Sequence, residues 1–173
     1  GRAGYIFQTS PFLEYSNHQY KAMKNAYAGH LKYSFQLRPH TVADQAYIGA
    51  YQGIGVGYFN FGNPEELGNP LAVYLFQGGR IAQFSPRISL NYEWNFGASF
   101  GWKPYDEYDN PENQIIGSKV NAYLNVNLYL KWTLSPKFDL MIGATGSHFS
   151  NGNTQYPNSG LNTVDSKVGL VYN

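Results

Sequence analysis

The sequence contains no cysteine, which excludes disulfide bonds, thiolate metal ligands and a cysteine nucleophile. Charged residues make up only 13% of the chain, which is about half the fraction found in typical soluble domains. No run of apolar residues approaches the length of about 18 that a membrane helix needs, so an α-helical membrane protein is excluded. The net charge is +1 and basic blocks are missing, which argues against nucleic-acid binding. No signal peptide is visible, as expected if the numbering starts after its removal.

Aromatic residues and glycine are abundant. Aromatics make up 17% of the chain, with 16 Tyr and 11 Phe, and there are 19 Gly. Low charge with many aromatics is typical of strands that form an apolar belt between aromatic girdles. The length of 173 residues fits one domain, which we assign to residues 1–173.

Apolar and polar residues alternate with a period of two over long segments. Between residues 87 and 102 the even positions, from Ile88 through Trp94 to Trp102, are apolar or aromatic, and the odd positions are polar or small. Residues 120–134 repeat this pattern, which predicts strands with two different faces. Strands are predicted at about 5–14, 31–37, 46–59, 69–78, 87–102, 120–134, 137–150 and 161–173, with no helix.

The predicted connections alternate in length. The first, third, fifth and seventh, at 15–23, 60–70, 103–117 and 151–160, are longer than those at 38–45, 78–82 and 135–137. Outer-membrane barrels combine long outside loops with short periplasmic turns in this way. The sequence therefore predicts an all-β fold, an eight-stranded antiparallel up-and-down transmembrane β-barrel.

Near its end, the predicted strand at 137–150 carries a histidine and a serine, which can act together as a base and a nucleophile. His148 and Ser150 are two positions apart, so they project from the same face, and that face is the apolar one. If the apolar face meets lipid, both side chains lie on the outer wall near the outer rim. A serine hydroxyl becomes a nucleophile when an imidazole accepts its proton. The Asn151 side chain and the Gly152 N–H are nearby candidates for the oxyanion hole.

The same stretch resembles the lipid A deacylase (PagL) family of outer-membrane barrels. Residues 148–151 read His-Phe-Ser-Asn and residues 157–160 read Pro-Asn-Ser-Gly, which match the family pattern His-x-Ser-Asn followed by Pro-Asn-x-Gly. The resemblance implies that Ser150 is the nucleophile and His148 the base. It also implies removal of an ester-linked acyl chain from lipid A without a metal or other cofactor.

Residue 162 departs from the family pattern. The family places an acid two residues after the Gly, completing a Ser-His-Glu triad, and this position is Asn162 here. A neutral amide can orient an imidazole but supplies no negative charge to stabilise its protonated form. Asp165 is a poor substitute, because a side chain three positions further on faces away from that of Asn162.

Three functions stay open at this point. The first is the lipid A acyl-ester hydrolase, and the second is a catalytically degenerate structural or lipid-binding barrel of the same fold. The third is a soluble lipocalin-like carrier, because alternation alone does not tell which face points outward.

The expected partners follow from these functions. They are lipopolysaccharide with its lipid A, and membrane lipids; a homodimer also stays open. His18, His30 and His40 lack the spacing of metal ligands, so we expect no metal site. The acidic stretch 106–112 lacks the spacing of a calcium loop and is more typical of a solvated loop.

Overall fold

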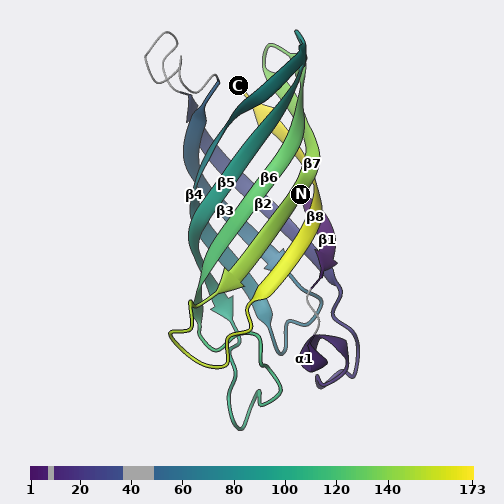
Figure 1. Ribbon diagram of the computed structural model, residues 1–173, viewed down its shortest axis with the longest axis vertical. Coiled ribbons are helices and arrows are strands. Elements are labelled where there is room, and N and C mark those ends of the chain that lie inside the picture. Colours follow the sequence, from purple (N-terminus) through teal and green to yellow (C-terminus); the bar gives the residue numbers. More distant parts are fainter. Residues whose placement is uncertain (8–9, 37–48) are drawn as a thin grey trace.

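The computed structural model describes residues 1–7, 10–36 and 49–173, and its strands form a closed antiparallel barrel in sequence order (Figure 1). The strands are β1 Arg2–Ile6, β2 Asn25–Gln36, β3 Tyr51–Asn60, β4 Gly68–Ser85, β5 Ile88–Trp102, β6 Val120–Ser135, β7 Phe138–Ser150 and β8 Leu161–Tyr172. Pairing of β1 with β8 closes the ring. The predicted all-β, eight-stranded up-and-down plan is confirmed.

The first predicted strand was wrong in its position, and the expectation of no helix was also wrong. β1 ends at Ile6, and a short helix, α1, covers Pro11–Glu14. The Ser10 hydroxyl accepts a hydrogen bond from the N–H of Leu13 at 3.2 Å, and Pro11 occupies the start of the helix. A serine cap followed by proline is a strong helix-start signal.

The predicted turn at 78–82 was also wrong, because β4 continues through it to Ser85. The chain turns instead at residues 86–87, and β4 shows register shifts between Arg80 and Ala82 and between Gln83 and Ser85. Irregular pairing of this kind lets a strand bend without ending. The predicted connection at 38–45, with His40, lies outside the described residues.

The long connections gather at one end of the barrel. The segments 61–67, 103–119 and 151–160 lie at the lower end in Figure 1 together with α1. The short turns at 86–87 and 136–137 lie at the opposite end with the C-terminus. The predicted asymmetry between the two ends is confirmed for the connections that the structure describes.

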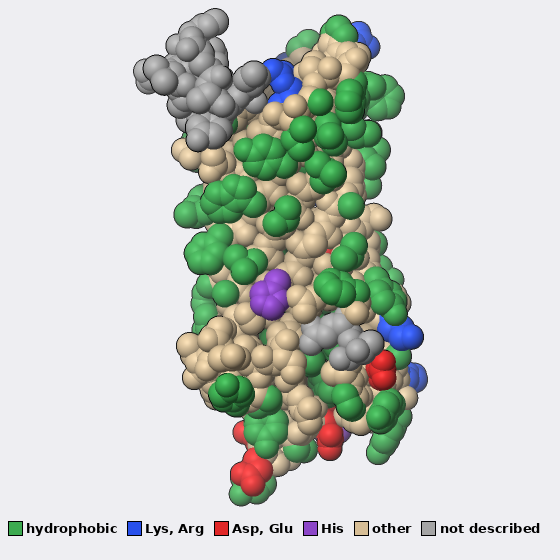
Figure 2. Space-filling view, viewed as in Figure 1, with side chains coloured by type: hydrophobic (Ala, Val, Ile, Leu, Met, Phe, Trp, Pro, Cys, Tyr) green, Lys and Arg blue, Asp and Glu red, His purple; other side chains and the backbone are tan. Residues whose placement is uncertain are grey.

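The outer wall of the barrel is apolar. Leu124, Val126 and Leu128 of β6 point outward with 43%, 66% and 51% of their surfaces exposed. The alternate residues Asn125 and Asn127 point inward and are buried. Figure 2 shows green apolar side chains spread over the wall between the two ends. A soluble carrier barrel has the opposite distribution, so this arrangement disagrees with the lipocalin-like alternative.

Polar side chains fill the middle of the lumen. The Glu93 carboxylate forms ion pairs with Lys32 and, at 3.7 Å, with Lys167. Arg2 donates hydrogen bonds to Tyr123 at 3.1 Å and to Asn125 at 3.2 Å. An eight-stranded barrel has room inside only for side chains, and here they form a connected polar core.

Aromatic rings close the lumen beneath the long loops. The side chains of Phe59, Phe61, Trp102, Tyr123 and Phe149 are buried and contact one another with centroid distances of 5.0–6.1 Å. The alternation over 87–102 predicts that Trp102 shares the outer face of the wall with Trp94, and this prediction is wrong: Trp102 is 4% exposed and turns inward. Gly101, whose φ is +87°, breaks the alternation just before it.

Among the described residues, no helix is long and apolar enough to cross a membrane.

Candidate active site

The end of β7 places His148 and Ser150 on the outer wall and Phe149 inside. His148 and Ser150 are half-buried, whereas Phe149 has no exposed surface. The Phe149 ring lies 5.0 Å from that of Phe59 and 5.1 Å from that of Tyr123, between centroids. The interior aromatic cluster thus anchors the strand at the residue between the two polar groups, and the predicted shared face of His148 and Ser150 is correct.

The imidazole of His148 joins two side chains. Its Nε2 lies 2.9 Å from Ser150 Oγ, and its Nδ1 lies 2.7 Å from Asn162 Oδ1. An amide oxygen can only accept a hydrogen bond, so Nδ1 carries the proton and donates it to Asn162. The lone pair of Nε2 is then free to accept the Ser150 O–H. This is the tautomer that a serine nucleophile requires of its base.

Asn162 reaches this position through the register of the sheet. It lies directly opposite His148 in the β7–β8 pair, although 14 residues separate them in the chain. Asp165 points into the lumen, is 6% exposed and accepts a hydrogen bond from the Thr163 hydroxyl at 2.9 Å. The prediction that Asp165 faces away from Asn162 is therefore correct, and Asp165 does not contact the imidazole.

Gly160 brings the loop 151–160 back onto the pair. Its φ is +72°, a conformation that L side chains rarely adopt. A Cβ atom at this position would lie 3.1 Å from His148 Cε1 and 3.0 Å from the carbonyl oxygen of Phe149. A side chain here would therefore press on the imidazole as well as strain the backbone.

The two candidates for the oxyanion hole follow Ser150 in the loop. The Asn151 side-chain amide donates to the carbonyl of Gln155 at 2.7 Å, and its backbone N–H donates to Asn158 Oδ1 at 3.1 Å. Gly152 is exposed next to it. The Asn151 amide would therefore have to leave Gln155 before it could donate to an oxyanion.

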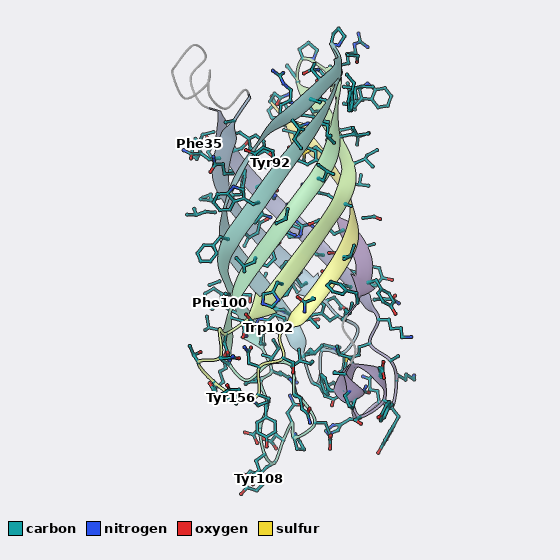
Figure 3. The ribbon with its side chains drawn as sticks, in the orientation of Figure 1. Phe35, Tyr92, Phe100, Trp102, Tyr108 and Tyr156 are labelled. Atoms are coloured by element: carbon teal, nitrogen blue, oxygen red, sulfur yellow. The ribbon has the colours of Figure 1, made fainter. Side chains whose placement is uncertain are left out.

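The apolar wall lies on one side of the pair, and the long loops lie on the other. Leu124 of β6 lies opposite His148, and Val164 of β8 lies two residues beyond Asn162 on the same outer face, half-exposed. The long loops extend beyond the ends of the strands. Tyr108 and Tyr156 lie in these loops at the lower end in Figure 3, with 87% and 75% of their surfaces exposed. A molecule with an apolar chain and a polar head could place its ester bond at this boundary.

The two other described histidines, His18 and His30, take no part in the hydrogen bonds of this pair. His30 points into the lumen, where its Nδ1 lies 2.9 Å from the Tyr74 hydroxyl. His18 lies in the loop after α1, and His40 is outside the described residues. The described part of the chain holds no group of three or more His, Cys, Asp or Glu side chains that could bind a metal ion.

Comparison with models of known protein families shows which family the chain belongs to. A family model described as lipid A 3-O-deacylase (PagL) matches residues 3–171. The chain belongs to the lipid A 3-O-deacylase (PagL) family. PagL proteins are outer-membrane enzymes that act on lipid A of lipopolysaccharide, and their activity is that of an ester hydrolase. Comparisons with curated proteins and with solved structures gave no match.

The packing of the long loops in this PagL-family chain was not predicted from the sequence. Asn110 and Asn113 lie in the segment interpreted only as a polar connection, yet they are 6% and 0% exposed. One signal was present in the sequence: the apolar pair Ile115 and Ile116 within a polar stretch, both fully buried. Such a pair indicates a loop that folds back on the protein.

Proposed function

We propose that this chain hydrolyses an ester-linked acyl chain of lipid A in the bacterial outer membrane, with Ser150 as nucleophile and His148 as general base. The observation that carries the proposal is the 2.9 Å contact between His148 Nε2 and Ser150 Oγ on the apolar outer wall. Family membership supports the substrate class, and the exposed apolar side chains support a lipid environment for the wall.

The reaction begins when Ser150 Oγ attacks the carbonyl carbon of the acyl ester, and His148 Nε2 takes the hydroxyl proton. The N–H groups of Gly152 and of a released Asn151 side chain stabilise the oxyanion. The C–O bond to the sugar then breaks, and His148 returns the proton to the sugar oxygen. Water then attacks the acyl-serine while His148 Nε2 takes its proton; the bond to Ser150 Oγ breaks, the proton passes to Oγ, and a fatty acid is released.

Asn162 holds the imidazole in the required tautomer during these steps. It supplies orientation through the 2.7 Å hydrogen bond but no negative charge opposite the imidazolium. In a serine protease triad the change from acid to amide lowers kcat by about 10⁴. We therefore expect slow turnover compared with a triad that contains an acid.

The test uses the purified full chain in detergent with lipopolysaccharide, and lipid A is analysed by mass spectrometry. The wild type is expected to release one fatty acid, whereas Ser150→Ala and His148→Ala are not. Ser166→Ala is the matched control, because Ser166 is exposed on the same wall but lies opposite Ala144, away from the imidazole. Release that persists in Ser150→Ala would exclude this mechanism.

A second candidate is a barrel that binds lipid A without cleaving it. The neutral side chain at position 162 favours this alternative. Asn162→Glu, which restores the family acid, separates the two candidates. Activity in the wild type supports the hydrolase, and activity in Asn162→Glu alone supports the degenerate site.

A further inference from the structure

The loops at the active-site end are joined by buried polar side chains that the hydrolysis itself does not use. Glu66 is 2% exposed, and its carboxylate accepts hydrogen bonds from the His18 N–H at 3.1 Å and the Asn63 amide at 2.6 Å. This carboxylate connects the loop after α1 with the loop 61–67. The backbone carbonyl of Glu66 in turn accepts hydrogen bonds from side chains of the loop 103–119.

Asn113 forms that connection and uses both ends of its amide. It is fully buried, and its Nδ2 donates to the carbonyls of Glu66 at 3.0 Å and Lys103 at 2.8 Å. Its Oδ1 accepts from the backbone N–H groups of Ile115 at 3.1 Å and Ile116 at 3.2 Å. A buried polar group with all its partners present rigidifies its surroundings. Asn113 thus fixes the backbone at 115–116.

The end of the loop 151–160 is hydrogen-bonded to the backbone just before and at these residues. The N–H of Gly160 donates to the carbonyl of Ile115 at 3.0 Å, and the N–H of Ser159 donates to that of Gln114 at 3.3 Å. The two loops also touch at Gly117, where a Cβ atom would overlap the carbonyl oxygen of Pro157. Gly160 lies against His148 and two residues before Asn162. The position of the backbone at 114–116 therefore affects where the chain enters β8 and where Asn162 lies.

We propose that Asn113 is a positioning residue for the hydrolysis, holding residues 159–160, and through them Asn162, beside His148. This inference rests on the proposed function. Without the Asn113 amide, the N–H groups of Ile115 and Ile116 lose their acceptor, and the carbonyls that receive Ser159 and Gly160 are free to move. A displacement of about 1 Å at a catalytic group can lower the rate about 100-fold.

Asn110 provides a matched control. Its Nδ2 also donates to the carbonyls of Glu66 at 2.9 Å and Lys103 at 3.3 Å, but its side chain makes no hydrogen bond to Ile115 or Ile116. Asn113→Ala and Asn110→Ala therefore remove similar contacts to the neighbouring loop. They differ in their effect on the carbonyls that hold the active-site loop.

Asn113→Ala is expected to lower kcat for fatty-acid release by about 10- to 100-fold with KM changed less than about twofold. Asn110→Ala is expected to leave both constants within about twofold of the wild type. Equal losses of kcat in the two variants, a loss confined to KM, or an unchanged kcat in Asn113→Ala would overturn the proposal.

Amide hydrogen exchange supplies a readout that does not depend on activity. Exchange at Ser159 and Gly160 is expected to accelerate in Asn113→Ala and not in Asn110→Ala. If the wild type releases no fatty acid, the proposed function fails, and slow exchange at these amides in Asn113→Ala would still count against the positioning role.

Gly117→Ala keeps the proposal testable if Asn113→Ala does not fold. The added methyl group pushes the two loops apart at Pro157, and kcat is expected to fall while KM is maintained. Gly29→Ala is its control, because a Cβ atom at Gly29 meets nothing within 4 Å. An unchanged kcat in Gly117→Ala would overturn the coupling between the loops on which the role of Asn113 depends.

Discussion

His148 and Asn162 are direct antiparallel partners across β7 and β8, and their side chains meet in a 2.7 Å hydrogen bond from ring to amide. The sheet register itself therefore delivers the orienting group to the imidazole. Backbone pairing places residue 162 opposite His148, and in the proposed site the chemical identity of this residue determines whether a negative charge faces the imidazole.

Changing the charge at position 162 without changing its shape is the most direct test of this arrangement. Asn162→Asp is isosteric and places a carboxylate where the amide oxygen now accepts from Nδ1. Because a carboxylate stabilises the imidazolium that forms during attack, kcat is expected to rise at least about tenfold. Initial rates of fatty-acid release measure it. A fall in kcat to the level of Asn162→Ala would contradict an orienting role with a missing charge.

Gly160 tests how closely the loop approaches the imidazole. Gly160→Ala places a methyl group near His148 Cε1 at a residue whose φ is +72°. Strain of about 1–3 kcal/mol is expected in the folded state, together with a loss of most activity. Thermal unfolding and fatty-acid release are measured beside Gly29→Ala, which lies on an open part of the wall. Equal behaviour of the two variants would show that the close approach has no effect.

Substitution of Phe149 tests whether the interior aromatic cluster anchors β7 beneath His148 and Ser150. Phe149→Ala removes a fully buried ring that contacts Phe59, Phe61, Trp102 and Tyr123. The free energy of unfolding is expected to fall by about 3–5 kcal/mol, as for other buried aromatics replaced by alanine. Urea unfolding in lipid vesicles measures the change. Phe149→Leu, which retains much of the volume, is expected to lose less; equal losses would argue against ring packing as the anchor.

Leu128 tests whether the apolar wall faces lipid. It is 51% exposed near the middle of β6, so Leu128→Arg would place a charge in the hydrocarbon region. The expected cost is about 2–4 kcal/mol in the free energy of folding into vesicles. Tyr108→Arg, in the long loop beyond the strands, is expected to change this energy by less than about 0.5 kcal/mol. Similar values for the two variants would contradict a lipid-facing wall.

Much of the barrel could be predicted because strand alternation is a local property. Each of the segments 120–134 and 137–150 carries its own period of two, and a shared face for His148 and Ser150 follows from counting. Predictions failed where one residue changes that count. Gly101 turns Trp102 inward, and the irregular pairing after Arg80 extends β4 through an expected turn.

The candidate site was predictable in part for the same reason. The pair at 148 and 150 lies on one strand, and a family motif marked position 162. The role of Asn113 could not be predicted, because it depends on contacts between loops that are far apart in sequence. A buried asparagine and a solvated one look the same in a polar segment. Only the three-dimensional packing of the loops distinguishes them.

The outward placement of His148 and Ser150 also affects how the rate of the proposed hydrolysis depends on the concentration of its substrate. In the proposed hydrolysis, a lipid substrate would reach the pair from the side of the wall, by lateral diffusion within one leaflet, without entering the lumen. Turnover is then expected to follow the mole fraction of lipopolysaccharide in the surrounding lipid rather than its amount per volume. Added detergent would slow the reaction by surface dilution even when the protein and the total substrate are held constant.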